Sequence, residues 1–242
     1  MVTWGDSRYG GYSGGVASSI NGTIPVTSIY SNSCAFAALR SDGSVVTWGN
    51  MLSAGNSSSV ASFIDGEVPV TAIYSTYQAF VALRSDGLVV TWGNRYGGGD
   101  SSSVATMIDG TIPVTSIYVN SNAKDSYGAF AALRSDGSVV TWGDSSYGGD
   151  SSSVATKIDG TIPVTAIYSA SGSSGGAFAA LRSDGSVVTW GSSSYGGDSS
   201  EVLEDINGDI DVTSIYPTHD GFLAQRTNGT FIIWGGTGKL KF

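Results

Sequence analysis

The residue types that carry acid–base, nucleophilic or metal chemistry are scarce in this chain of 242 residues. Its one histidine, His219, stands beside Asp220, and its one cysteine, Cys34, excludes an intramolecular disulfide. A catalytic triad with histidine as the base would have to use His219, which lies in a short polar segment typical of a surface loop. We therefore expect His219 at the surface and predict that the chain is not an enzyme.

The twenty acidic residues leave one enzymatic alternative open, a carboxylate pair that hydrolyses glycosides. Many of these acids stand in recurring Asp-Gly pairs, and Asp65, Asp109 and Asp159 also follow an isoleucine. Calcium prefers six to eight oxygen ligands, which one carboxylate per copy does not supply. Turn formation explains these residues better, so we predict no metal site and no cofactor.

Five arginines, one beside each predicted hairpin turn, are the other regular charged set. Four of them have an aspartate two residues later, as in Arg40 and Asp42, and we expect ion pairs. The alternative is a ring of arginines that binds an anionic ligand. Asn228 replaces the aspartate in the last copy, so we predict that Arg226 is the arginine that lacks an acidic partner. The five are Arg40, Arg84, Arg134, Arg182 and Arg226.

The overall charge limits the classes of partner. The formal net charge is -9, and a chain of that sign is repelled by nucleic acid and by anionic membrane surfaces. The sequence has no run of 18 apolar residues and no recognisable signal peptide, so we expect no membrane insertion. Its acidic composition, rich in Ser, Gly and Thr, favours a secreted or cell-surface protein.

The elements that would position these residues repeat along the chain. Tryptophan recurs at intervals of 44, 44, 50, 48 and 44 residues, each time in a Trp-Gly pair after a β-branched run. Two β-prone runs joined by Asp-Gly predict a hairpin, as at Ala35–Arg40 and Val45–Gly49. If Asp42 and Gly43 both adopt positive φ, Ala37 lies opposite Trp48. Both faces of this hairpin are apolar, which predicts that both are covered, with the tryptophan in the core. The six tryptophans are Trp4, Trp48, Trp92, Trp142, Trp190 and Trp234.

A third strand is predicted at 24–30, with a proline near its start, and its copies lie at 68–74, 112–118, 162–168 and 210–216. The stretch between the Trp-Gly pair and this strand, for example 150–160, predicts either a short helical turn capped by Asp150 and ended by Gly160 or a short outer strand. The linker after the third strand holds 4, 4, 10, 8 and 4 residues and accounts for all the variation in repeat length. Insertions confined to one slot lie on one face of a repeat assembly. These linkers are 31–34, 75–78, 119–128, 169–176 and 217–220.

The hairpin motif resembles a known repeat. The segment Ala-Leu-Arg-Ser-Asp-Gly-Ser-Val-Val-Thr-Trp-Gly at 132–143, followed by Tyr-Gly-Gly-Asp at 147–150, resembles the RCC1-like β-propeller repeat, in its divergent bacterial and environmental branch. The resemblance covers essentially the whole chain and implies an all-β propeller. The copies lack the histidine that the family often has before its Ala-Leu pair, and no residues match the nucleotide-exchange role of part of the family. Units of 44 residues favour blades of three strands plus a turn.

We therefore predict one all-β tandem-repeat domain over 1–242, a propeller of five blades, with a six-bladed ring or an open array as alternatives. The repeat units run approximately over 1–44, 45–88, 89–138, 139–186 and 187–230, with a terminal strand at 231–235. Six Trp-Gly segments accompany five copies of every other element, so the segment at 2–5 or the one at 231–235 is surplus. A surplus strand either closes a ring or pairs with another copy.

The predicted function is a non-enzymatic binding module that presents its variable linkers to a protein or glycan partner. The alternative is a self-assembling structural protein, such as a surface layer or viral appendage, linked through the surplus strand. Tyrosine and charged residues among Ser, Gly and Asn are typical of recognition loops, although these linkers also fit solvated spacers. The candidate contact residues are Tyr77, Asn122, Lys124, Asp125, Tyr127, His219 and Arg226.

Overall fold

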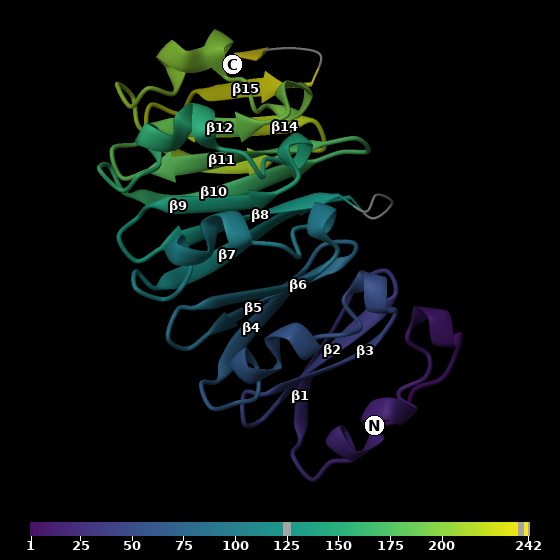
Figure 1. Ribbon diagram of the computed structural model, residues 1–242. Helices are drawn as coiled ribbons and strands as arrows, with labels where there is room; N and C mark the ends of the chain where they lie inside the picture. The colour runs from purple at the N-terminus through teal and green to yellow at the C-terminus, as the bar shows by residue number, and fades with distance from the viewer. Residues whose placement is uncertain (123–126, 237–239, 242) are drawn as a thin grey trace. The chain divides into compact units, whose positions relative to one another are not determined.

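The computed structural model describes residues 1–122, 127–236 and 240–241 of the chain, and within them the backbone forms five sheets in chain order (Figure 1). Four sheets have three strands, and the fifth adds a short fourth strand. The chain divides into two compact units, Met1–Val114 with the first two sheets and Thr115–Phe242 with the other three. The strands are β1 Val26–Ser31, β2 Ala35–Arg40, β3 Val45–Gly49, β4 Val70–Ser75, β5 Ala79–Arg84, β6 Val89–Gly93, β7 Val114–Ser121, β8 Gly128–Arg134, β9 Val139–Gly143, β10 Val164–Ser171, β11 Gly176–Arg182, β12 Val187–Gly191, β13 Val212–Pro217, β14 Gly221–Arg226, β15 Phe231–Gly235 and β16 Leu240–Lys241.

The hairpin forms where the sequence predicts it, but its register is one residue off the predicted one. Leu39 pairs with Val45, and Trp48 lies opposite Phe36 rather than Ala37. Arg40 N donates to the Ser44 carbonyl at 2.9 Å, which leaves a three-residue loop with only Gly43 at positive φ. The Asp42 carboxylate accepts hydrogen bonds from the amide and the hydroxyl of Ser44, at 3.0 and 2.5 Å. Those bonds favour a negative φ at Asp42, so that glycine alone lies in the left-handed region.

The corrected register sorts the side chains onto two distinct faces, because directly paired residues share a face. One face, the aromatic face, carries Phe36 and Trp48, whose ring centroids are 5.3 Å apart in a stacked arrangement. The other, the alanine face, carries Ala35, Ala37 and Thr47. The same Phe–Trp pair recurs in the other sheets, with centroids 5.4 to 5.6 Å apart; it is tilted in the second sheet and stacked in the other three.

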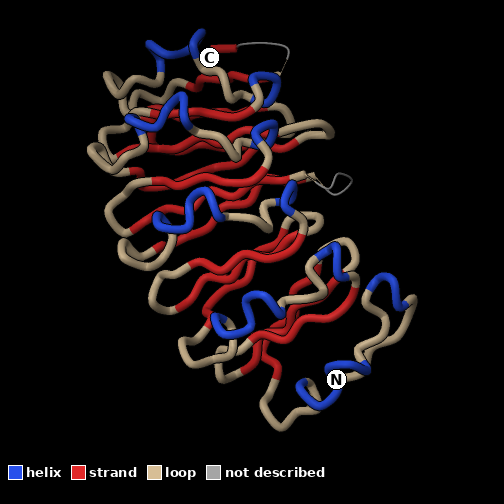
Figure 2. Tube along the Cα trace, viewed as in Figure 1, coloured by secondary structure: helices blue, strands red, loops and turns tan. Residues whose placement is uncertain are grey.

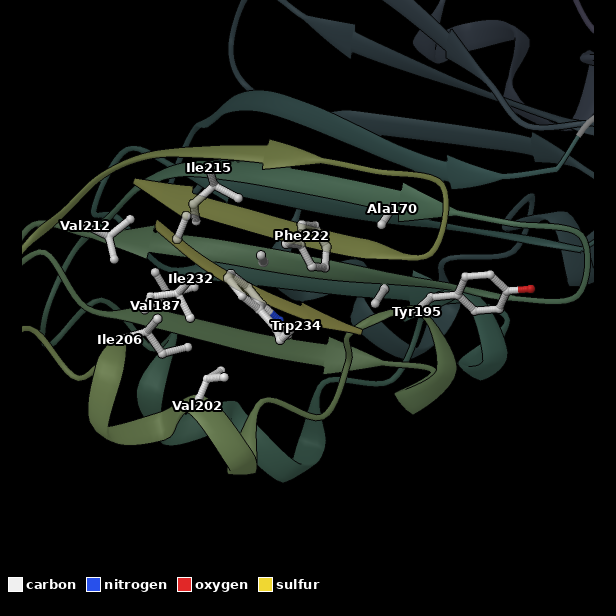
Figure 3. Packing of buried hydrophobic residues seen from close by; sticks show 13 residues of the cluster. Ala170, Val187, Tyr195, Val202, Ile206, Val212, Ile215, Phe222, Ile232 and Trp234 are labelled. Carbon is white, nitrogen blue, oxygen red and sulfur yellow. The ribbon is translucent and has the colours of Figure 1, made fainter. Parts of the chain in front are cut away.

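Within each unit, the alanine face of one sheet packs on the aromatic face of the next. In the first unit, Ala37 and Leu39 share a core with Phe80 and Trp92. In the second unit, the same contact joins the third sheet to the fourth and the fourth to the fifth, where Figure 3 shows Phe222 and Trp234 in the cluster. Each fully buried phenylalanine ring contributes about 2–3 kcal/mol of transfer free energy. The predicted cover on both faces of the hairpin is therefore confirmed for the fourth sheet, which has a neighbouring sheet on each face within its unit.

The stretch after each of the first five Trp-Gly pairs is helical, which decides between the two predicted alternatives (Figure 2). Asp150 accepts a hydrogen bond from Ser152 N at 2.9 Å, at the start of a six-residue 3₁₀ helix whose C-cap, Ile158, is buried. The 3₁₀ helices are η1 Ser7–Tyr9, η2 Gly14–Ser19, η3 Met51–Ser53, η4 Ser58–Phe63, η5 Arg95–Gly97, η6 Ser102–Met107, η7 Ser145–Tyr147, η8 Ser152–Lys157, η9 Ser193–Tyr195 and η10 Ser200–Asp205.

The predicted third strand begins two residues later than expected and is the strand next to β2. Pro25 stays outside it because proline has no N–H to donate to the ladder, and its carbonyl accepts from Ser41 N at 2.8 Å instead. None of the helices among the described residues is long and apolar enough to span a membrane.

Candidate functional site: the linker rim

In each unit, the variable linkers and the three-residue 3₁₀ helices meet at one edge of the sheets. Antiparallel pairing brings them together, because the linker joins β1 to β2 at the edge where β3 ends. In the first unit, Asn32 Nδ2 donates to Ser53 O at 2.6 Å, and Thr76 Oγ1 donates to Gly97 O at 2.7 Å. We call this edge the linker rim: residues 32–34, 51–54, 76–78 and 95–98 in the first unit, and 122, 127, 145–148, 172–175, 193–196 and 218–220 in the second.

The long linkers of the second unit are partly extra strand. Strands β7 and β10 each have eight residues, where β1, β4 and β13 have six. Buried Asn120 on β7 donates to the carbonyls of Ala170 and Ala177 at 3.1 and 2.9 Å, and Asn122 donates to Gly172 O at 3.0 Å. Asn120 and Asn122 therefore tie the end of β7 and the start of its linker to the neighbouring sheet by side-chain hydrogen bonds.

Tyr195 fixes the shape of the rim in the second unit. Its ring is buried, and its phenol oxygen lies 3.2 Å from the Ser174 hydroxyl and 3.4 Å from the Ser174 amide. The hydrogen bond with the Ser174 side chain lowers the pKa of the Tyr195 phenol. The linker at 172–175 is thus held against η9.

The rim of the first unit exposes apolar side chains that the sequence analysis missed. Met51 is 70% exposed, Leu52 78% and Tyr96 51%. The Arg95 guanidinium lies 4.9 Å from the centroid of the Tyr96 ring, a cation–π geometry. The sequence does contain a signal for these exposed side chains. The two positions after the Asn or Asp that follows Trp-Gly are Met-Leu and Arg-Tyr here, whereas the corresponding positions 145–146 are Ser-Ser, as are the equivalent positions 193–194.

Most of the predicted contact residues that the structure describes lie on the rim. Tyr77 is half-buried, and its carbonyl accepts from Ser33 N at 3.1 Å. Asn122 is half-buried, Tyr127 is 46% exposed, and both belong to the same linker. His219 is exposed, with Nδ1 2.5 Å from Asp220 Oδ1. Lys124 and Asp125 lie outside the described residues.

Arg226 does not belong with them, and the expectation that it lacks an acidic partner is wrong. It is 6% exposed and lies at the end of β14 away from the rim. Its Nη1 lies 3.4 Å from Asp205 Oδ1 and 3.2 Å from the Asp205 carbonyl, and its Nε donates to Thr230 Oγ1 at 2.8 Å. The acidic partner comes from η10 rather than from the turn, a contact between segments that local spacing does not reveal. The other four arginines pair with their turn aspartates at 2.6 to 3.9 Å, as predicted.

The chemistry available on the rim is hydrogen bonding and aromatic contact.

Five of the six tryptophans are at most 5% exposed, as predicted, whereas Trp4 is 83% exposed. Among the described residues, no three His, Cys, Asp or Glu side chains are grouped to hold a metal ion. The aspartates after isoleucine act in turns, for example Asp109, which accepts from Thr111 N at 2.8 Å.

Comparison with known proteins gives structural matches alone. No family model and no curated protein matches the chain. Human WBSCR16 is similar at a TM-score of 0.50 and 17% identity, over 88% of this chain and 62% of that one. The ectodomain of the Physcomitrella patens receptor kinase CR4 gives 0.48 and 18% over 89% and 53%, and yeast RCC1 (Prp20) gives 0.46 and 18% over 87% and 56%. The chain thus spans less than two thirds of each of these proteins.

The likeness to human WBSCR16 shows the fold. The chain has an RCC1-like repeat β-propeller fold with five blades, and the predicted all-β class and blade count are confirmed. Each sheet described above is one blade.

Proposed function

We propose that the chain is a non-enzymatic binding module whose linker rim contacts a protein partner. The observation that carries the proposal is the contrast between the rim and the rest of the repeat. Core positions repeat almost unchanged, as in the Ala-Phe-x-Ala-Leu-Arg segment of four copies, while the rim changes in both length and chemistry. A rigid scaffold with one variable edge is the usual arrangement of a recognition surface.

The side chains exposed on the rim favour a protein over a glycan. Met51 and Leu52 are adjacent and more than two-thirds exposed, and neither side chain is an aromatic ring on which a sugar would stack. Methionine, tyrosine and arginine are enriched at the centres of protein interfaces. The Arg95 and Tyr96 pair on the same rim adds a second contact of this kind.

The repeat itself supplies the variants that test the proposal. Met51→Ser with Leu52→Ser, and Arg95→Ser with Tyr96→Ser, convert two rim turns into the Ser-Ser turn of the third and fourth copies, so the 3₁₀ helices are expected to persist. A cross-linking and pull-down comparison with cells of the source should recover a protein that wild type binds and the double variants bind at least about tenfold more weakly. A matched double variant at exposed positions off the rim, Phe63→Ser with Met107→Ser, should bind as wild type does.

Three results would contradict the proposal. Equal binding by wild type and both rim variants would remove the rim as the contact surface. If wild type binds a specific glycan on an array and the rim variants do not, the partner is a glycan rather than a protein. Turnover of a glycoside that a single carboxylate substitution abolishes would refute the non-enzymatic assignment.

A further inference from the structure

Arg95, on the linker rim of the first unit, is the one arginine without an acidic partner in the part of the chain that the structure describes. The other six arginines lie 2.6 to 3.9 Å from a carboxylate oxygen of an aspartate. Arg95 is exposed. Its charge contributes, after the hydrogen bonds from Ser102, to a lowered pKa of Asp100, but the two charged side chains form no ion pair. Arg95 therefore departs from the pairing that holds for every other arginine.

The residue that begins the rim turn explains why Arg95 is unpaired. The equivalent turn of the first copy begins with Asp6, whose carboxylate lies 2.7 Å from the guanidinium of Arg8. The turn of Arg95 begins instead with Asn94, whose neutral side chain accepts a hydrogen bond from Tyr96 N at 2.8 Å. An amide caps the turn as well as a carboxylate does, but it does not neutralise a guanidinium. The positive charge of Arg95 is therefore available to a ligand.

The contact with Tyr96 holds this charge in one place. The guanidinium carbon of Arg95 lies 4.9 Å from the centroid of the Tyr96 ring. A guanidinium stacked on an aromatic ring keeps its planar fork of donors, which matches a carboxylate through two parallel hydrogen bonds. Because the stack restricts the arginine side chain before a ligand arrives, less conformational entropy is lost on binding. Arg95 is thus preorganised to accept a carboxylate.

The rim turn of Arg95 adjoins the rim turn that carries Met51 and Leu52. The two apolar residues occupy the positions in their turn that Arg95 and Tyr96 occupy in the next. A series of hydrogen bonds along the rim joins the two turns: Asn32 Nδ2 to Ser53 O at 2.6 Å, Ser33 N to Tyr77 O at 3.1 Å, and Thr76 Oγ1 to Gly97 O at 2.7 Å. An unpaired cation and an exposed apolar pair therefore belong to one hydrogen-bonded surface.

The exposure of these positions is a property of the turn itself. The equivalent residues of the third and fourth copies, at 145–146 and 193–194, are exposed as well. The turn of the fourth copy, η9, contacts β11 and β15 of the second unit, so its two positions stay exposed even with a neighbouring sheet of the same unit on each side. What distinguishes the first unit is the chemistry of the exposed side chains.

We propose that the protein partner of the rim presents a carboxylate that pairs with Arg95 and, beside it, an apolar side chain that packs on Met51 and Leu52. The carboxylate is that of an aspartate, a glutamate or a chain end. The inference rests on the proposed function, because it takes the rim as the contact surface, and it adds the chemistry of the group that is recognised. Since the formal net charge of the chain is -9, an acidic segment is repelled by the molecule as a whole, and its preference for this rim should depend on Arg95.

The probe is a synthetic library of random short peptides, tethered by their N-termini and ending in a free carboxylate or in an amide. Wild type should select peptides that carry a carboxylate close to leucine, methionine or phenylalanine. Selection of both forms assigns an acidic side chain, and selection of the free acids alone assigns the chain end. Arg95→Glu should select lysine or arginine at that position instead. Lys157→Glu makes the same change of charge at an exposed position of η8 and should select the peptides that wild type selects.

Fluorescence polarisation with one selected peptide tests the pairing directly. Arg95→Gln should raise the dissociation constant at least about tenfold, and replacing the peptide carboxylate by its amide should raise it by a similar factor. Once either group is neutral, neutralising the other should have little further effect, because the pair is already lost. Arg95→Lys should weaken binding less than Arg95→Gln, since it keeps the charge and loses only the planar fork.

The outcomes separate this inference from the proposed function. A library from which wild type enriches no carboxylate-bearing peptide would overturn the inference. Peptides that bind Arg95→Gln as tightly as wild type, but are lost with Met51→Ser and Leu52→Ser, would overturn it while leaving the rim as the contact surface. Peptides that no rim variant weakens would overturn the proposed function as well. Equal weakening by Arg95→Glu and Lys157→Glu would show that overall charge, and not a contact with Arg95, governs binding.

Discussion

Replacing Trp92 by phenylalanine removes one buried hydrogen bond while keeping an aromatic ring in place. The indole Nε1 donates to the carbonyl of Ala54 at 3.1 Å, and the side chain is 3% exposed. The ring of Trp92 also packs on Phe80, with centroids 5.6 Å apart. A phenyl ring can keep that contact, but it has no donor for the Ala54 carbonyl.

The expected loss of stability has two parts. A buried carbonyl that loses its donor costs about 1–3 kcal/mol. The ring shrinks by about 40 Å³, which adds about 1 kcal/mol if the space stays empty. We expect the free energy of unfolding of the first unit to fall by about 2–4 kcal/mol.

Urea unfolding followed by near-ultraviolet circular dichroism measures this loss, and Trp4→Phe is its matched control. Trp4 is 83% exposed, so the same chemical change there should alter the free energy of unfolding by less than about 0.5 kcal/mol. Equal losses for the two variants would refute the reasoning, because they would show that neither the buried bond nor the core position distinguishes Trp92. A Trp92→Phe variant as stable as wild type would also refute the reasoning, because the buried hydrogen bond would then contribute nothing to stability.

Two further predictions concern the sheets and the turns. Gly176→Ala should lower the free energy of unfolding in urea by about 1–3 kcal/mol, because the added methyl would overlap the amide of buried Asn120. The control Gly15→Ala has open space around the added methyl and should lower it by almost nothing, so equal effects of the two variants would contradict the prediction. Hydrogen bonds from Ser44 lower the pKa of Asp42 below its ordinary value of 3.8. The ionised Asp42 carboxylate therefore stabilises the folded state above that pH, and this stabilisation is lost as the pH falls through the folded-state pKa. Urea unfolding at a series of pH values should therefore show that Asp42→Asn loses less stability than wild type on acidification below about pH 4, and an identical pH dependence would contradict the assignment.

The strands could be predicted from the sequence because period-2 apolar runs and the Asp-Gly pair are local signals. The register could not, because it depends on whether Asp42 or only Gly43 takes a positive φ. That choice is made by the hydrogen bonds of the aspartate with Ser44, which compete with the two-residue turn. One residue of difference moved Trp48 to the face of Phe36.

The position of the linker rim was predictable in part. Length variation in one slot located the edge, and Tyr77 and Asn122 lie there. Exposure at Leu52 was missed, since the sequence does not show that the turn after Trp-Gly lies beside the linker. Arg226 was misjudged for a similar reason, because Asp205 reaches it from a 3₁₀ helix 21 positions earlier in the chain.

The indole hydrogen bonds also join the core to the rim. The carbonyl that receives the Trp92 bond belongs to Ala54, the residue that ends η3 at a φ of 70°. The same bond ties Trp190 to Gly148 and Trp234 to Gly196, each the residue that ends a rim turn. A buried side chain of one sheet thus anchors the turn that displays rim residues of the preceding copy. A partner that binds Leu52 therefore meets a turn already held in place, and it avoids the ordering cost that a mobile loop would incur.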